Sequence, residues 1–258
     1  MSSRIALVGG GASGIGYATA RQLALSGHGV VLAGRTPETL VAAASRLHQS
    51  TGAAVDALVH DMAAPDLAEH AVAEVEARHG RLDVLVLNAG GPPPGRILAV
   101  DDKGWREAID LILLGPLQLA RQALPRMAER GFGRVVFVTS TAVRQPQPDL
   151  ATSVVLRAAV TAAAKLLSRE FAANGVTVNC VAPGATATER RQQILAHRAH
   201  ATGGSYASAD ADDNAWIPAG RAGEPAEIGA AVAFLASAAA SYVNGTVLAV
   251  DGGRTETI

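Results

Sequence analysis

Short apolar runs alternate with longer helical patterns along almost the whole chain, and this alternation restricts the possible folds more than any other feature. The runs are rich in β-branched residues and apolar throughout, which is typical of strands covered on both faces in a parallel sheet. The predicted strands are Ile5–Gly9, Gly29–Ala33, Ala54–Val59, Val84–Leu87, Arg134–Thr139, Thr177–Val181 and Val247–Val250. The predicted helices are Gly14–Ser26, Pro37–Ser50, Ala64–His79, Lys103–Arg130, Leu150–Ala173 and Pro225–Ser237. We therefore predict an α/β fold, a doubly wound parallel sheet of the Rossmann type, formed as a single domain by residues 1–258.

One late segment departs from this regular alternation. Thr186 to Trp216 is long and polar, and it contains Gly203-Gly204-Ser205 and the acidic stretch Asp210–Asp213. In an otherwise tight α/β chain, a loose insertion of this kind is typical of a lid that closes over a substrate. We expect a substrate lid at about residues 186–216.

Composition limits the partners and the compartment. Hydrophobic residues make up 49% of the chain and the net charge is −1, so a large core is expected and no basic surface favours nucleic acid or an acidic membrane. The single cysteine, Cys180, cannot form an internal disulfide, which fits a reducing compartment. Met1–Arg4 lead directly into a strand-like run without the apolar stretch of a signal peptide. We expect a cytoplasmic protein with no metal site.

A long uncharged window from Ile228 to Val250 has the length of a membrane span. Polar residues interrupt it, and the Asn244-Gly245 pair is a turn signal. A helix followed by a buried strand explains this window better than a membrane helix.

A glycine cluster joins the first predicted strand to the first helix. The sequence is Gly9-Gly10-Gly11-Ala12-Ser13-Gly14-Ile15-Gly16. Glycines allow the backbone to turn tightly and to approach a pyrophosphate, and the helix that follows supplies free N–H groups and the positive end of its dipole. Because the cluster lies inside a strand–helix–strand unit, it predicts a dinucleotide site. Its binding residues are Gly10, Ser13, Gly14, Ile15 and Gly16.

The spacing Gly10-x3-Gly14-x-Gly16 resembles that of the short-chain dehydrogenase/reductase family, with Gly9 in place of a threonine. Further matches follow in order along nearly the whole chain, and the chain resembles the 3-oxoacyl-carrier-protein reductases of this family. They are Asp61, Asn88-Ala89-Gly90, Pro183-Gly184 with Thr188, Ala219–Pro225, Tyr242–Gly245 and Val250–Gly253. The resemblance implies that the adenine side of the cofactor contacts Asp61 and Met62. It also places Asn88, Ala89, Gly90, Pro183, Gly184, Thr186 and Thr188 in the cofactor site.

The end of the second strand indicates which dinucleotide is bound. An acidic residue there would hold the ribose 2′-hydroxyl and repel a 2′-phosphate. This chain has Gly34 where NAD-selective relatives carry aspartate, and Arg35 follows. A guanidinium can pair bidentately with a phosphate. We expect NADP(H) as the cofactor, although an arginine at a strand end can also be merely solvated.

The family's catalytic Tyr-x3-Lys pair is missing. Ser140 matches the family serine, but Ser153 stands at the tyrosine position and Arg157 at the lysine position. Ile112 replaces the family asparagine. A serine hydroxyl is far less acidic than a phenol, whose pKa is about 10, and it is shorter. Arg157 keeps the positive charge that can bind the nicotinamide ribose, so we expect cofactor binding to be retained and proton delivery to be changed or lost, with Ser140, Ser153 and Arg157 as the catalytic candidates.

Three functions remain open. The favoured one is an NADP(H)-dependent reductase that acts on an activated C=C, C=N or carbonyl group of a small molecule, since such substrates need little help from an enzyme acid. The alternatives are a redox-neutral isomerase or cyclase and a non-catalytic NADP-binding protein. Other possible proton donors lie in the loop before the helix (Arg144, Asp149) and in the lid (His197, His200, Tyr206). The resemblance also implies a homo-oligomer, most simply a tetramer.

Overall fold

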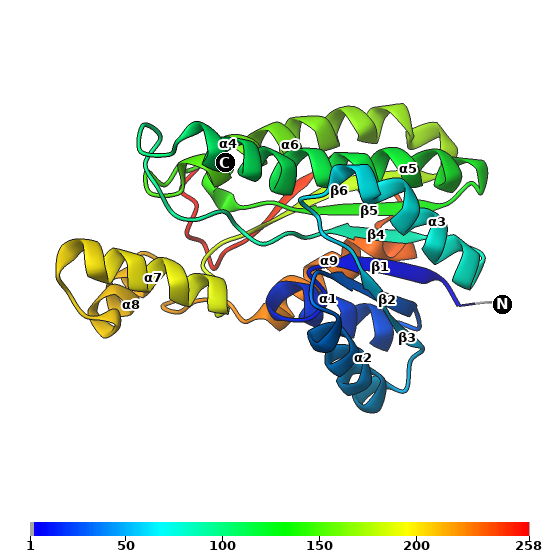
Figure 1. Ribbon diagram of the computed structural model, residues 1–258, viewed down its shortest axis with the longest axis horizontal. Helices are drawn as coiled ribbons and strands as arrows, with labels where there is room; N and C mark the ends of the chain where they lie inside the picture. Colours follow the sequence, from blue (N-terminus) through cyan, green and yellow to red (C-terminus); the bar gives the residue numbers. More distant parts are fainter. Residues whose placement is uncertain (1–2, 258) are drawn as a thin grey trace.

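A computed structural model describes residues 3–257 and contains a seven-stranded parallel sheet with helices on both faces (Figure 1). The strand order is β3-β2-β1-β4-β5-β6-β7. The strands are β1 (Ile5–Gly9), β2 (Gly29–Gly34), β3 (Val55–Val59), β4 (Val84–Leu87), β5 (Gly133–Val138), β6 (Val176–Pro183) and β7 (Val247–Val250). The predicted doubly wound fold is confirmed, and each predicted strand is present with its ends shifted by a few residues at most. The order reverses between β1 and β4, so the crevice at their carboxyl ends is where a ligand is expected.

The two faces of the sheet are covered by different helices. One face packs against α3 (Ala68–His79), α5 (Gly115–Glu129) and α6 (Ala151–Glu170), around the buried Phe137 of β5. The other packs against α1 (Gly14–Leu25), α2 (Pro37–Thr51) and α9 (Pro225–Ala236), around Leu32 of β2. β1, β2 and β4 are apolar throughout because both of their faces are buried, and β5 is apolar except for the buried Arg134 near its start. The window from Ile228 to Val250 contains α9 and β7, as the sequence predicted.

The predicted helix Lys103–Arg130 is interrupted. It consists of α4 (Asp102–Ile109), a π-helical turn η2 (Asp110–Leu114) and α5. A Cβ on Gly115 would lie 1.7 Å from the carbonyl oxygen of Met62, so the start of α5 presses against the chain after β3. The wide turn brings Ile112 into the core, where it is buried.

The segment predicted to be loose, residues 186–216, is helical. It holds α7 (Glu189–Thr202) and α8 (Tyr206–Ala215), separated by the short Gly203–Ser205 turn. In Figure 1 the pair projects from the body of the molecule beyond the carboxyl ends of the strands. The prediction of an irregular segment was therefore wrong, because Thr188 and Ser205 cap the two helices and Gly203 ends α7 in a left-handed conformation.

α6 is long and apolar enough, by length and composition, to cross a membrane, and 33% of its most apolar window is buried. Its inner side packs on the sheet through Leu156, Val160 and Ala164. On its outer side Val155 is 43% and Leu166 is 63% exposed. The helix therefore belongs to the core on one side and presents an apolar surface on the other.

Candidate functional site

The glycine-rich turn lies at the carboxyl edge of the sheet, between β1 and α1. Gly10 and Gly14 have φ values of +58° and +53°, in the left-handed region that favours glycine. A Cβ on Gly16 would lie 2.1 Å from the carbonyl oxygen of Gly10, so a side chain there cannot be accommodated. Ser13 is exposed and its hydroxyl makes no capping bond, while Ile15 packs toward the core. The turn thus offers a hydroxyl and the first N–H groups of α1, which are the donors that a pyrophosphate needs.

Segments from two other strand ends meet this turn. The Asn88 side chain donates from Nδ2 to the carbonyl oxygen of Gly9, over 3.1 Å, which ties the end of β4 to the end of β1. Nothing lies within 4 Å of a Cβ placed on Gly90, so the space above it is open. After β6, the Thr188 methyl group lies 3.5 Å from a Cβ placed on Gly14. The residues predicted from three distant parts of the sequence are therefore brought together.

The remaining cofactor candidates surround this centre. Asp61 accepts a hydrogen bond from the Ala63 N–H over 3.0 Å, and the Met62 side chain packs against Gly9. Beyond β6, Thr186 donates to the carbonyl oxygen of Gly184 over 3.2 Å. Three further candidates are placed by their strands: Pro183 ends β6, Gly184 bonds to β7, and Ala89 packs against the core. The shape and the donors of this edge fit a dinucleotide.

Arg35 is exposed just after β2. Within residues 3–257 its side chain makes no hydrogen bond and no ion pair. Gly34, at the end of β2, carries no side chain that would repel a phosphate. The position is therefore open to a second anionic group from the adenosine side of a cofactor.

The three catalytic candidates lie where β5 ends and α6 begins. Arg157 Nη1 donates to the carbonyl oxygen of Val138 over 2.6 Å, and its Nε donates to Ser153 Oγ over 3.1 Å. Ser140 follows Val138 by two residues, and its hydroxyl accepts from the Ala142 N–H over 3.1 Å. Ser153 Oγ is thus held by a cation and cannot occupy the place of a longer phenol, while Arg157 is fixed to the strand end.

A second arginine, which the sequence analysis did not single out, lies near Arg157. Arg190 is in the first turn of α7, and its Nη2 donates to the carbonyl oxygen of Pro92, just after the Asn88–Gly90 segment. A Cβ on Gly91 would lie 2.7 Å from Arg190 Nε, so this glycine makes room for the guanidinium. Burial, and then the charge of Arg190, lowers the pKa of Arg157 to about 10. No local sequence signal marks Arg190, because its contacts are with residues about a hundred positions away.

Three other arginines in and near α7 and α8 are paired with carboxylates, and they are Arg191, Arg198 and Arg254. Asp213 is almost fully buried and accepts hydrogen bonds from Arg191, Arg198 and Arg254. Arg198 also binds Asp149 in the loop before α6, with Nε 2.7 Å from a carboxylate oxygen. Burial alone would raise the pKa of Asp149, but the Arg198 guanidinium lowers it, so this carboxyl stays ionised and is a poor proton donor.

A cavity of about 740 Å³ lies beside this network. Its walls come from the Gln145–Asp149 loop, from α7 and α8, and from the C-terminal Arg254 and Thr255. Trp216, at the end of α8, is 71% exposed and forms part of the wall. The cavity offers room for a small molecule beside α7 and α8. Asp149, one of the possible proton donors, lines it, but none of the cofactor candidates and none of Ser140, Ser153 and Arg157 does.

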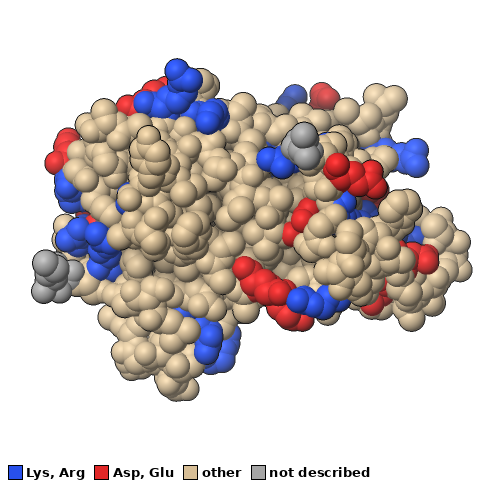
Figure 2. Space-filling view, turned by 180° about the vertical axis from the view of Figure 1, so that it is seen from behind, with Lys and Arg blue, Asp and Glu red and all other residues tan. Residues whose placement is uncertain are grey.

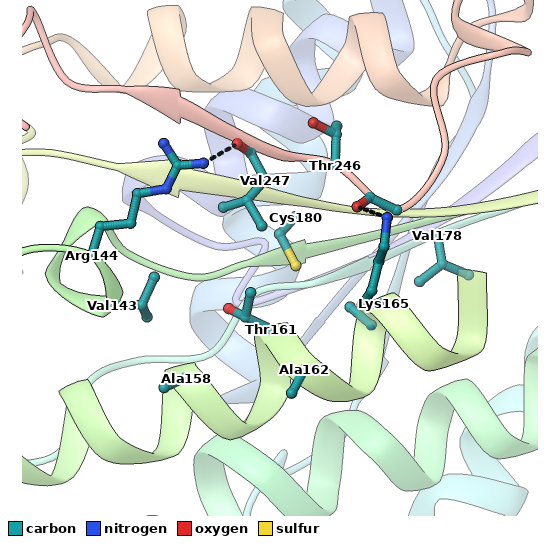
Figure 3. A pocket seen from close by; sticks show the side chains of 12 residues that line it. Val143, Arg144, Ala158, Thr161, Ala162, Lys165, Val178, Cys180, Thr246 and Val247 are labelled. Carbon is teal, nitrogen blue, oxygen red and sulfur yellow. Dashed lines mark hydrogen bonds between the residues drawn. The ribbon is translucent and has the colours of Figure 1, made fainter. Parts of the chain in front are cut away.

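A second cavity, of about 410 Å³, lies on another side of α6 (Figure 3). Small and apolar side chains of α6 face the strands β6 and β7 there, with the thiol of Cys180 between them. Lys165 donates to the carbonyl oxygen of Gly245 over 3.1 Å. Arg144, one of the possible proton donors, lines this cavity and donates to the carbonyl oxygen of Val247 over 3.4 Å. None of the cofactor or catalytic candidates lines it, so it is separate from the cofactor edge.

Known proteins share this architecture and much of the sequence. Residues 10–255 match the sequence profile of a family described as Enoyl-(Acyl carrier protein) reductase. Human Dehydrogenase/reductase SDR family member 4 is 31% identical over 98% of this chain and 88% of its own length. Cis-4-hydroxycyclohexanecarboxylate dehydrogenase of Sinomonas cyclohexanicum is 37% identical over 98% and 97% of the two chains.

Two solved structures superimpose along the whole chain. A variant of actinorhodin polyketide ketoreductase, described with NADPH, has a TM-score of 0.95 at 32% identity. YwfH, described as an NADPH-dependent reductase involved in bacilysin biosynthesis, has a TM-score of 0.94 at 28% identity. Both comparisons cover 100% of each chain.

Proposed function

Since this chain belongs to the short-chain dehydrogenase/reductase family, we propose that it is an NADP(H)-dependent reductase that works without the family's tyrosine as proton donor. The observation that carries the proposal is the Ser153–Arg157 pair. It stands at the helix positions of the family's tyrosine and lysine. Ser153 is a far weaker acid than a phenol, and Arg157 already donates from Nε to Ser153 and from Nη1 to the carbonyl oxygen of Val138.

The cofactor is NADP(H). When bound, it supplies a hydride to the substrate. The glycine turn with Ser13 receives the pyrophosphate, Arg35 receives the 2′-phosphate, and Arg157 with the Pro183–Thr188 segment holds the nicotinamide end. NADPH in the description of both solved structures supports this choice.

Without a phenol in the site, the preferred substrates are those that do not leave an unprotonated alkoxide. Hydride addition to a simple ketone creates an alkoxide that needs a proton or strong donors as its charge develops. A conjugated C=C, or an iminium carbon that already carries positive charge, needs less of both. Ser140 and Arg157 can hold a substrate oxygen at the end of β5, but Arg157 does not release its proton readily.

The test is NADPH consumption with a panel of ketones, 3-oxoacyl thioesters, enones and cyclic imines. General acid catalysis contributes a factor of about 10²–10⁴ to the rate. Ketones should therefore react more slowly, by about that factor, than with a family member that has the tyrosine and lysine. Ser153→Tyr combined with Arg157→Lys should raise the ketone rate, within the limit set by the absent asparagine at Ile112. Brisk ketone turnover by the wild type would contradict the proposal. Turnover without cofactor oxidation would instead indicate an isomerase or cyclase, and tight NADPH binding without turnover a non-catalytic protein.

The α7–α8 pair is proposed as the substrate lid at about residues 186–216 of a single domain. The support is its place beside the larger cavity and the ion pairs of Arg198, which join it to the loop before α6. The substrate is a small molecule that enters below these helices. One relative's name specifies a cyclic hydroxy acid, which is a molecule of suitable size for such a cavity.

We propose further that the chain forms a homo-oligomer, most simply a tetramer. The exposed apolar side of α6, with Val155 and Leu166, is suited to burial against a second copy. In the view of Figure 2, a broad area left of centre carries no charged side chains, and a surface of this kind also favours contact. Sedimentation as a 26.2 kDa monomer at micromolar concentration would exclude this assembly. A cytoplasmic location stays a prediction.

A further inference from the structure

Arg157 has no acidic partner. Its two hydrogen-bond acceptors, the carbonyl oxygen of Val138 and Ser153 Oγ, are both neutral. Within residues 3–257 no carboxylate lies within ion-pair distance of it. The side chain is partly buried, and a buried guanidinium without a counter-charge costs free energy that neutral acceptors only partly offset.

Arg190 also lacks an acidic partner among the described residues. Its side chain extends from α7 to the chain after β4, where Nη2 donates to the carbonyl oxygen of Pro92. Burial lowers its pKa, and no acid within the described part of the chain compensates. The guanidinium packs directly on Gly91, where a Cβ would lie 2.7 Å from its Nε. The start of α7 and the chain after β4 therefore meet at this cation.

The two guanidinium groups repel one another, since the charge of Arg190 disfavours protonated Arg157. Asp149 and Asp213 pair instead with Arg191, Arg198 and Arg254. A pair of like charges without an internal counter-ion is balanced when an anion occupies the site. Arg157 is bonded to Val138 at the end of β5, two residues before Ser140, and Arg190 is bonded to Pro92, two residues after Gly90. An anion bound by both would therefore lie beside the nicotinamide end of the cofactor site.

We propose that Arg157 and Arg190 together bind the carboxylate of the substrate, so that the substrate is a small organic acid. This inference rests on the proposed function for the identity of the reacting molecule. A planar guanidinium fork matches the two oxygens of a carboxylate, and two such forks provide more donors than a neutral carbonyl can use. The binding would fix the acid beside Ser140 and neutralise the pair without any proton transfer. The same chemistry would also suit a phosphate of the cofactor, and the test separates the two.

The experiment measures binding by calorimetry to protein saturated with NADPH. The probes are benzoate with benzamide and cyclohexanecarboxylate with cyclohexanecarboxamide, which share shape and differ in charge. The wild type should bind each acid about tenfold or more tightly than its amide. Arg190→Met should remove that preference and leave amide binding unchanged, while Arg190→Lys should restore part of it. Lys165→Met, which removes a cation bonded to a carbonyl oxygen elsewhere on α6, is the matched control and should change nothing.

The affinity for NADPH decides whether the two arginines bind a substrate carboxylate or a phosphate of the cofactor. If the substrate is the partner, Arg190→Met should change the dissociation constant of NADPH by less than about threefold. Equal binding of acids and amides by the wild type, together with a tenfold loss of NADPH affinity in Arg190→Met, would assign the pair to a cofactor phosphate and overturn the proposal. The readout is independent of turnover. Acids that bind through the pair in a protein that reduces nothing would refute the reductase and leave the carboxylate site standing.

Discussion

Arg190 and Arg191 are neighbours in the first turn of α7, yet they belong to two groups of arginines, of which only one is paired with described carboxylates. Arg191 joins Arg198 and Arg254 around the buried Asp213, where carboxylates balance the guanidinium charges. Arg190 lies near Arg157, and both donate to carbonyl oxygens and form no ion pair with a described carboxylate. In the first group, carboxylates of the chain balance the guanidinium groups and join α7 and α8 to neighbouring segments. In the second group no described carboxylate balances the two guanidinium groups, and this is the reason to propose an anionic ligand there.

The largest expected effect comes from breaking the first group. Asp213→Ala leaves three arginines without their shared acceptor, and removing one partner of a buried pair typically costs about 3–5 kcal/mol. We expect the free energy of opening of α7 and α8, measured by amide hydrogen exchange, to fall by about that amount. Asp212→Ala, next to it but exposed and outside the ion pairs, is the control and should leave the exchange unchanged. Equal protection in the two variants would show that the carboxylate does not hold the lid.

A smaller effect is expected at Arg35, a third unpaired arginine, which is exposed rather than confined. It should pair with the 2′-phosphate of NADPH, so the wild type should bind NADPH more tightly than NADH. Arg35→Ala should lose about 1.5–3 kcal/mol of NADPH binding, or more than tenfold in affinity, and little for NADH. Titration of both cofactors against both proteins measures this. Equal affinities in the wild type would show that the selectivity is assigned to the wrong residue.

The smallest effect, and the one of opposite sign, is expected at Arg157 in the unliganded protein. Replacing an uncompensated buried charge by an apolar side chain is neutral or stabilising, so Arg157→Met should leave the free energy of unfolding unchanged or raise it by about 1 kcal/mol. Because the folded-state pKa of about 10 lies below that of the unfolded chain, any penalty is present below pH 10 and is relieved as the pH rises through it. Urea unfolding at pH 7 and at pH 11, above the folded-state pKa, checks both statements. Clear destabilisation at pH 7 would mean that the neutral hydrogen bonds of Arg157 outweigh its charge.

Features with local sequence signals could be predicted, whereas features that depend on contacts between distant residues could not. The strands and the glycine turn were predictable because their signals are local: apolar runs, and glycines between a strand and a helix. The helices α7 and α8 were not, since part of what orders them is contacts such as Arg198 with Asp149, which lie 49 residues apart. The π-helical turn at Ile112 has no local sequence signal either, and Gly115, which follows it, packs against the distant Met62. Arg190 was missed for a similar reason, because the lack of an acid around it is a property of the folded chain alone.

The only thiol of the chain sits on β6, beneath α6, with 1% of its surface exposed. Burial raises the pKa of Cys180 to about 12, so in the native protein it is both covered and protonated. Since thiol reagents attack the thiolate, we expect modification to require an opening between α6 and β6 that exposes the thiol to the reagent and to water. The rate at which a maleimide labels the native protein therefore measures how often that opening occurs. The chain thus carries its own probe of local opening, and no cysteine needs to be engineered to follow it.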